Sequence, residues 1–219
     1  MRAVLGTPVV RGRSPGDPPP PPATGSRRLL AEPEAVDAVG EALAALHWNA
    51  SSPGAVPVVL AATDYCVRAA DAFAARCDDP TRRLRPSDSV ALEASGLLQR
   101  FTALTGWQGP GYAIAEPDGD GSAALRFARG LVESGRAPSV YLCEVLRRAD
   151  TGAFWAVATR VHREPADQTG HRSTEAGGHP PAPADGPSHG LDPDTSRRSA
   201  VMRATVRPSS PEPAEEQLP

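Results

Sequence analysis

The stretch GPGYAIAEPDGDGSAALRFARGLVESGR, residues 109–136, predicts a strand, a tight turn and a helix in direct succession. Its apolar run Tyr112–Ala115 is typical of a buried parallel strand. Residues 116–121 combine glycines with carboxylates, and apolar residues recur at helical spacing from Ser122 onward. Gly135 stands where a glycine commonly ends a helix. Because a sharp strand-to-helix turn is where α/β enzymes display a nucleophile, this turn is the first candidate site.

The turn presents Asp118, flanked by Glu116 and Asp120. These carboxylates have two interpretations that remain open: a general acid/base set, or two caps for the helix that follows, which we favour. Asp118, Asp120 and Ser122 also match the start of a calcium loop, but the glycine and glutamate that such a loop needs later are missing. We therefore expect no metal site.

Bulk composition narrows the classes of partner. The chain has 219 residues and a net charge of −3, so it has room for one domain and a tail, and no polyanionic partner such as nucleic acid is implied. No apolar run approaches the ~20 residues of a membrane span, and the N-terminus does not resemble a signal peptide. The three cysteines lack CxxC spacing, which favours free thiols and a cytoplasmic protein. Cys143 is expected to be a packed thiol, and Cys66 to be a poor candidate nucleophile.

Outward from the opening stretch, hydrophobic periodicity predicts further strands and helices. The expected strands are residues 3–10, 56–62, 112–115, 139–146 and 153–161, and the expected helices are 33–48, 64–77, 87–105 and the helix that begins at residue 122. The order β-α-β-α-α-β-α-β-β indicates an α/β fold with a mostly parallel five-stranded sheet that ends in a β-hairpin. The loop 11–28 is rich in proline.

After residue 162 the character of the sequence changes. Residues 163–219 lack aromatic side chains and are dominated by Pro, Ser, Gly, Glu and Asp, so we expect a disordered tail behind one domain, residues 1–162. One short exception, Ala200–Val206, is apolar enough to bind something transiently.

The sequences of two stretches resemble the N-terminal half of β-ketoacyl synthases, in the thiolase superfamily. Residues 87–110, SDSVALEASGLLQRFTALTGWQGP, end in the family's "tGwxGP" pattern, and residues 121–145, GSAALRFARGLVESGRAPSVYLCEV, contain its "sGradxvl" pattern. The resemblance covers about residues 3–162 and implies a thiolase-like half-domain. The family carries its catalytic cysteine at the turn, and in this chain Asp118 occupies that position.

The departures from the family pattern bear on activity. A carboxylate is a poor thioester acceptor, so Asp118 cannot replace the cysteine in acyl transfer without another source of activation. The family also uses two histidines from a C-terminal half, and only the tail follows residue 162 here. His47 and His162 are candidates by residue type alone, since neither lies on a matching motif. Condensation by this chain alone is therefore not expected.

Two functional hypotheses follow from the resemblance. The first is a non-catalytic partner, similar to a chain length factor, that binds a ketosynthase, an acyl carrier protein or both in polyketide or fatty-acid biosynthesis. In the family, dimers form through the strand that enters the turn, here Tyr112, Ala113, Ile114 and Ala115. The second is an enzyme that decarboxylates or hydrolyses acyl thioesters through Asp118, Glu116 or Asp120. A gene fragment without a role is the third possibility. No cofactor is implied, and an exposed apolar docking face is expected.

Overall fold

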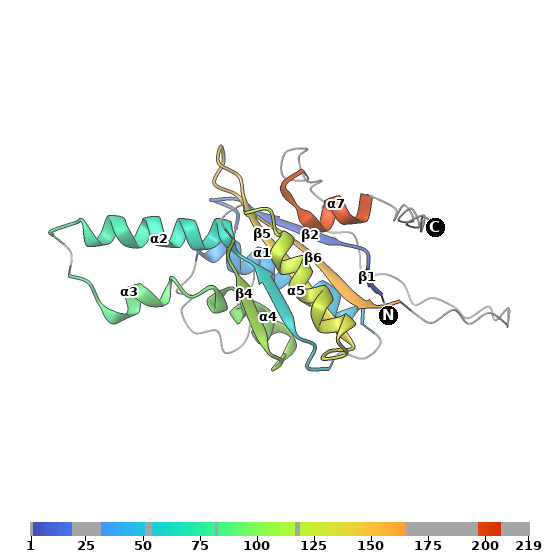
Figure 1. The fold of residues 1–219 in the computed structure, drawn as a ribbon. Helices are drawn as coiled ribbons and strands as arrows, with labels where there is room; N and C mark the ends of the chain where they lie inside the picture. The colour runs from blue at the N-terminus through green and yellow to red at the C-terminus, as the bar shows by residue number, and fades with distance from the viewer. Residues whose placement is uncertain are drawn as a thin grey trace, which may run out of the picture.

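A computed structural model describes residues 2–18, 32–50, 54–81, 83–116, 119–164 and 197–206. A central sheet carries helices on both faces (Figure 1). The strands are β1 (Ala3–Leu5), β2 (Val9–Arg13), β3 (Val58–Ala61), β4 (Gly111–Ile114), β5 (Ser139–Arg147) and β6 (Phe154–Arg163). The helices are α1 (Pro33–Trp48), α2 (Thr63–Cys77), α3 (Pro86–Val90), the 3₁₀ helix η1 (Ala94–Leu98), α4 (Gln99–Thr105), α5 (Ser122–Glu133) and α7 (Ala200–Val206).

The sheet has the order β1-β6-β5-β3-β4, and β2 also pairs with β6. β3 runs parallel to β4 and β5, whereas β6 is antiparallel to β5, β1 and β2. Five strands therefore point the same way and β6 alone runs against them. The predicted α/β class, the mostly parallel sheet and the hairpin formed by β5 and β6 are confirmed.

The sheet has six strands rather than five because the predicted strand 3–10 is split. The break falls at Gly6–Pro8, between β1 and β2, and proline has no backbone N–H for a strand ladder. Both pieces pair with β6. Residues 11–13 of the predicted proline-rich loop belong to β2, and residues 19–28 of that loop lie outside the described residues.

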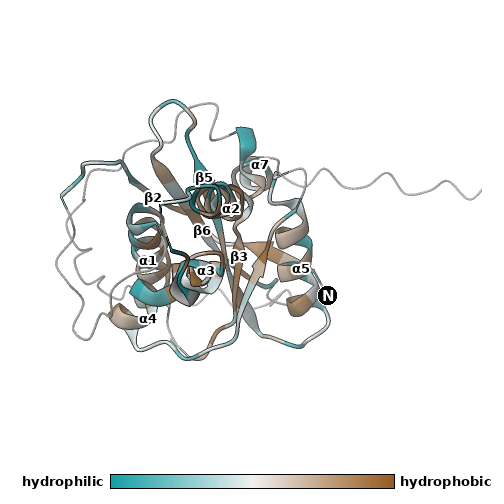
Figure 2. Ribbon diagram, turned by 90° about the vertical axis from the view of Figure 1, so that its left-hand side faces the viewer, coloured by the Kyte–Doolittle hydropathy of each residue, from teal (hydrophilic) through white to brown (hydrophobic). Residues whose placement is uncertain are grey.

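Two apolar layers enclose the sheet. Figure 2 shows α1 and α4 on one face, and α5 and α7 on the other. Residues of β3 alternate between the layers: Val58 and Leu60 pack with α1, and Val59 and Ala61 pack with α5. All four are buried, as the continuous apolar run 56–62 predicted for a central strand. The apolar face predicted for α5 is also buried: Ala124, Leu125, Ala128, Leu131 and Val132.

The prediction of one continuous helix over residues 87–105 is wrong. The chain instead forms α3, then turns, then forms η1 and α4. The carbonyl oxygen of Ala91 accepts a hydrogen bond from the hydroxyl of Tyr65 on α2 (2.7 Å), which holds the turn against α2. Leu97 and Phe101 reach the core, whereas Val90 is exposed, so burial supports only the second half of the predicted apolar face.

The family-like motif at residues 105–110 has a structural role. α4 ends at Gly106, and the next residue, Trp107, is buried against Phe101. The indole N–H of Trp107 donates to the carbonyl of Val56, just before β3 (2.8 Å). The motif thus joins the end of α4 to the central strand. At the end of α5, Gly135 has a φ of 75°, which confirms the predicted glycine stop.

The apolar exception in the tail, Ala200–Val206, is helix α7. The sequence predicted that this segment binds another molecule transiently, but α7 packs on the chain's own sheet. Val201 is fully buried there, in the same layer as α5. Residues 165–196 and 207–219 of the predicted tail lie outside the described residues. Within the described part of the chain, none of the helices is both long and apolar enough to cross a membrane.

Candidate functional site

The candidate site lies where the parallel strands β3, β4 and β5 end. Ala61, Ile114 and Glu144 are level with one another across these three strands. In open α/β sheets, ligands bind beyond this edge. Here α2 begins directly after β3, α5 is the next helix after β4, and α7 begins beside Glu144. Three helix N-termini therefore converge on one end of the sheet.

Glu116 and Asp120 cap helix α5. The Glu116 carboxylate accepts the backbone N–H of Ala123 (3.0 Å), and the Asp120 carboxylate accepts that of Ser122 (2.9 Å). Negative side chains at this position satisfy free N–H groups and favour the helix dipole. The geometry of both residues matches the capping interpretation. Asp118 and its neighbour Pro117 lie outside the described residues.

The pKa of Asp120 also argues against an acid/base role for this residue. The hydrogen bond from the Ser122 backbone lowers the pKa of the Asp120 carboxyl group, and Arg203 adds to this effect. A general base that works near neutral pH needs a raised pKa instead. The alternative hypothesis of an acyl-thioester enzyme loses support at this residue.

Sequence reasoning missed the most perturbed carboxylate of the site, Glu144 on β5. Its side chain is 1% exposed. It accepts hydrogen bonds from the hydroxyl of Ser199 and from the backbone N–H groups of Ala200 (2.9 Å) and Val201 (3.2 Å). Burial raises the pKa of Glu144 to about 7, against the lowering effect of these bonds. A charged residue inside the apolar run SVYLCEVL was the available signal.

Two arginines attach the α7 segment to other parts of the site. One guanidinium nitrogen of Arg198 donates to both carboxylate oxygens of Asp64, in the first turn of α2, at 2.8 Å each. Arg203 donates to the Asp120 side chain at 3.3 Å and to its backbone carbonyl at 3.0 Å. Asp64, Asp120 and Glu144 thus each have a partner in the α7 segment, and the partner of Glu116 is in α5.

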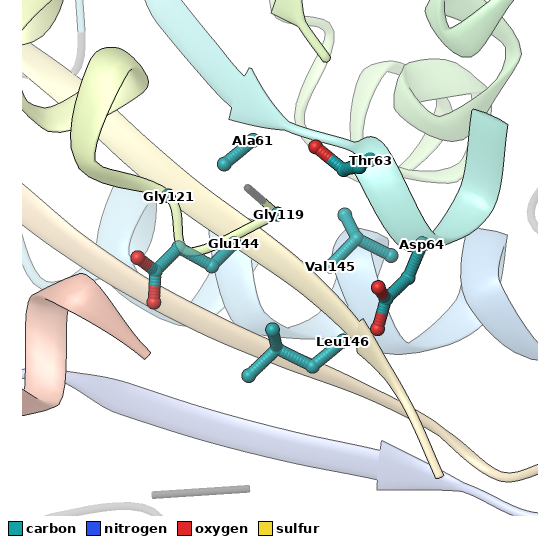
Figure 3. Close-up of a pocket in the computed structure, with 8 residues that line it drawn as sticks. All are labelled: Ala61, Thr63, Asp64, Gly119, Gly121, Glu144, Val145 and Leu146. Atoms are coloured by element: carbon teal, nitrogen blue, oxygen red, sulfur yellow. The ribbon is translucent and has the colours of Figure 1, made fainter. Parts of the chain in front are cut away.

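A small pocket lies between these groups, with room for about one water molecule. Ala61, Thr63, Gly119, Gly121 and Glu144 line it with parts of α2 and β5. In Figure 3 the Glu144 carboxylate points toward the α7 ribbon, and Asp64 lies on the other side of the pocket. The described residues hold no group of three or more His, Cys, Asp or Glu placed to bind a metal ion.

The candidate histidines and cysteines do not join this site. His47 is buried on α1 between the rings of Phe101 and Tyr141, where burial lowers its pKa. His162 on β6 pairs with Ser139, at the opposite end of β5 from Glu144. Burial raises the pKa of the Cys66 thiol.

Cys143 is a fully buried core residue, as predicted for a packed thiol. Burial raises its pKa strongly, which disfavours the thiolate that a nucleophile requires.

The strand that enters the turn is at the edge of the sheet. The sequence predicted a buried strand at Tyr112–Ala115, but β4 pairs only with β3 among the described strands, and Tyr112 is 39% exposed. The Tyr112 ring packs edge-on against Phe127 of α5, with ring centres 5.2 Å apart. Phe127 is 38% exposed, so the two rings form one apolar patch beside an open strand edge.

Comparison with known proteins adds evidence on the fold. No family model and no curated protein matches the sequence. One chain of a solved complex, a ketosynthase (ApeO) with its chain length factor (ApeC) from Xenorhabdus doucetiae, matches with a TM-score of 0.54 and 9% sequence identity. The match covers 75% of this chain and 80% of that chain, so the two are similar in length. This likeness confirms the predicted fold class, an α/β thiolase-like half-domain.

Proposed function

We propose that this chain is a non-catalytic subunit, similar to a chain length factor, that pairs with a ketosynthase of polyketide or fatty-acid biosynthesis. The observation that carries the proposal is the open edge of β4, beside the apolar patch of Tyr112 and Phe127. A strand edge offers unpaired N–H and C=O groups to a strand of another chain. The matched chain comes from a complex of a ketosynthase with a chain length factor, which favours a ketosynthase as the partner.

The register of β4 identifies which groups a partner strand would use. The carbonyls of Pro110 and Ile114 accept hydrogen bonds from β3, from the N–H groups of Val58 and Ala62. Because backbone groups alternate in direction along a strand, Tyr112 also bonds toward β3, and Ala113 presents its N–H and C=O to the open side. Pairing through the Ala113 backbone would therefore leave the chain's own sheet intact.

The outer face of α5 extends this surface. Phe127 lies on the same face as Ala123 and Gly130, and a side chain added at Gly130 would meet no atom within 4 Å. Small residues around an exposed aromatic ring allow a partner helix to approach closely. Strand pairing at β4 and helix packing on α5 would together make up the proposed docking face.

The non-catalytic part of the proposal is supported by the roles of the turn carboxylates. Glu116 and Asp120 are both engaged as caps of α5, and the pKa of Asp120 is lowered. Single-turnover assays with acyl and malonyl carrier proteins should give no condensation by the purified chain. Product formation by this chain alone would overturn the non-catalytic assignment.

The pairing is tested by co-expression with the ketosynthase encoded in the same gene neighbourhood, followed by native mass measurement. The wild-type chain should form a stable one-to-one complex. Ala113→Pro removes only the outward N–H, and proline is tolerated at such edge positions, so the chain should fold but bind the ketosynthase at least about tenfold more weakly.

Val67→Arg is the matched control, because Val67 is 55% exposed on α2, away from β4. It should leave the complex unchanged. A complex of equal affinity with Ala113→Pro would refute pairing at this edge, and a folded wild-type chain that ignores the ketosynthase would refute the partner.

A further inference from the structure

Residues Arg197–Val206, which we call the plug, are held at three points on three different parts of the chain. Arg198 binds Asp64 of α2, and Arg203 binds Asp120 at the turn before α5. The first turn of α7 binds Glu144 of β5 through Ser199, Ala200 and Val201. Every one of these contacts is polar, and each places a donor of the plug on a carboxylate of the body.

The apolar attachment of the plug comes from one side of α7. Ala200 and Val201 are buried and Met202 and Ala204 pack against the same apolar layer, whereas Arg197, Arg203 and Thr205 are exposed. α7 has seven residues, too few for a helix to persist in water without support from its surroundings. The short helix is therefore held by its polar anchors together with this apolar side, and the loss of two anchors should weaken the attachment.

The plug covers Glu144. Among the described residues, the donors to the Glu144 side chain all belong to the plug. The charged groups around it are Arg198 and Arg203 of the plug, with Asp64 and Asp120 opposite them. Gly121 has no side chain to fill the space beside the carboxylate, where the small pocket lies. Without the plug, this carboxylate would lose these three hydrogen bonds.

The sheet itself does not need the plug. The backbone of β5 pairs on one side with β3 and on the other with β6, along its whole central part. α1 and α4 cover one face, and α5 covers much of the other. Loss of the plug would remove no strand pairing.

We propose that Arg197–Val206 is a detachable plug that occludes a carboxylate site at Glu144, and that it leaves while the sheet stays folded. The site that it uncovers takes hydrogen-bond donors: the plug fills it with one hydroxyl group and two backbone N–H groups, flanked by arginines. This inference does not depend on the identity of the partner at β4.

The test uses the full-length chain with the double substitution Arg198→Ala and Ser199→Ala, which removes two anchors without altering the body. Hydrogen exchange should accelerate about ten- to a hundredfold in residues 200–205, because charged and buried hydrogen bonds are lost. Exchange in β5 and β6 should stay unchanged. Labelling of carboxyl groups with carbodiimide and an amine should rise severalfold at Glu144 relative to Asp71, an exposed residue of α2.

Arg197→Ala is the matched control, since this neighbouring arginine is exposed and the bond that it makes to Arg203 uses its backbone carbonyl, which the substitution keeps. It should change neither readout. Two results would overturn the proposal: exchange that accelerates in the plug, β5 and β6 together, which makes α7 an integral part of the core, or faster plug exchange with no new labelling of Glu144, which means that the plug does not cover it.

Discussion

The site around Glu144 and the edge strand β4 are neighbours in the fold, but they differ in how their polar groups are bonded. Those around Glu144 have partners within the chain, whereas one side of β4 is open. Around Glu144 each carboxylate meets donors from the same chain, and the Glu144 side chain is 1% exposed. Along β4 the Ala113 backbone faces outward, and the rings of Tyr112 and Phe127 remain more than a third exposed. One region is closed by intramolecular bonds and the other is left open.

This difference indicates where another molecule can bind at low cost. A partner at β4 gains backbone hydrogen bonds and covers apolar rings without breaking any contact of this chain. A ligand at Glu144 must first displace the plug and its three anchors. The four predictions below test each side of this comparison.

The largest effect is expected from Gly121→Ala. Gly121 has a φ of 75°, which costs an L-residue about 1–2 kcal/mol, and the added methyl group would collide with the Glu144 carboxylate. That carboxylate is held in place by the plug, so the total loss in free energy of unfolding should be roughly 3 kcal/mol. Chemical denaturation measures it.

Gly130→Ala is the control for this prediction, because its added methyl group meets open space on the outer face of α5. It should stabilise the chain by up to about 1 kcal/mol. Equal losses at the two glycines would mean that the Glu144 region is no more tightly packed than the α5 surface.

The second prediction concerns the pH dependence of stability. Burial raises the pKa of Glu144 to about 7 in the folded chain, above its ordinary value of 4.5, so the folded state binds more protons than the unfolded state between these values. Its contribution to stability is therefore present below pH 4.5 and is lost as the pH rises through 7. From pH 5 to pH 8 the loss should be about 2.5 kcal/mol.

Glu144→Gln should remove this component, since a glutamine does not titrate. The difference between the pH 5 and pH 8 free energies of unfolding, compared between wild type and variant, is the measurement. If the two differences are the same, Glu144 is not closed off from water in the way that the structure indicates.

Much of the fold could be predicted because local patterns and tertiary packing agree. For the apolar face of α5 and for the central strand β3, the residues that the sequence pattern predicts to be buried are the residues that are buried. Two of the failures have tertiary causes. The helix predicted across residues 87–105 breaks where Tyr65 holds the Ala91 carbonyl, and β4 is exposed because strand order, which apolar content does not reveal, puts it at an edge.

The candidate site was predicted less completely for a related reason. Glu116 and Asp120 were identified because they precede a helix in the sequence, where capping is a local rule. Glu144 was not, because its donors come from Ser199 and the two residues after it, more than fifty positions along the chain. No local pattern links a strand residue to a distant helix N-terminus.

The third prediction checks the register of the open edge. Tyr112→Pro removes an N–H that bonds toward β3, whereas Ala113→Pro removes one that faces outward. The first should cost the isolated chain about 1–2 kcal/mol more than the second, because it leaves a β3 carbonyl unpaired. Thermal or urea unfolding of both variants gives the difference. The reverse order would place Ala113 in the ladder with β3 and invalidate the proposed pairing edge.

The smallest effect on the isolated chain is expected at the patch itself. Phe127→Ala removes a ring that is already 38% exposed and whose aromatic contact is with Tyr112, so the free energy of unfolding should fall by only about 1 kcal/mol. Leu131→Ala, one turn along α5 but buried, should cost about 2–5 kcal/mol. On the ketosynthase complex the order should reverse, because a ring at the centre of an interface contributes more than a residue that never meets the partner. Native mass titration of folded samples of both variants decides this. A complex that tolerates Phe127→Ala as well as the wild-type ring would show that the exposed patch is ordinary surface and that binding at this edge rests on the β4 backbone alone.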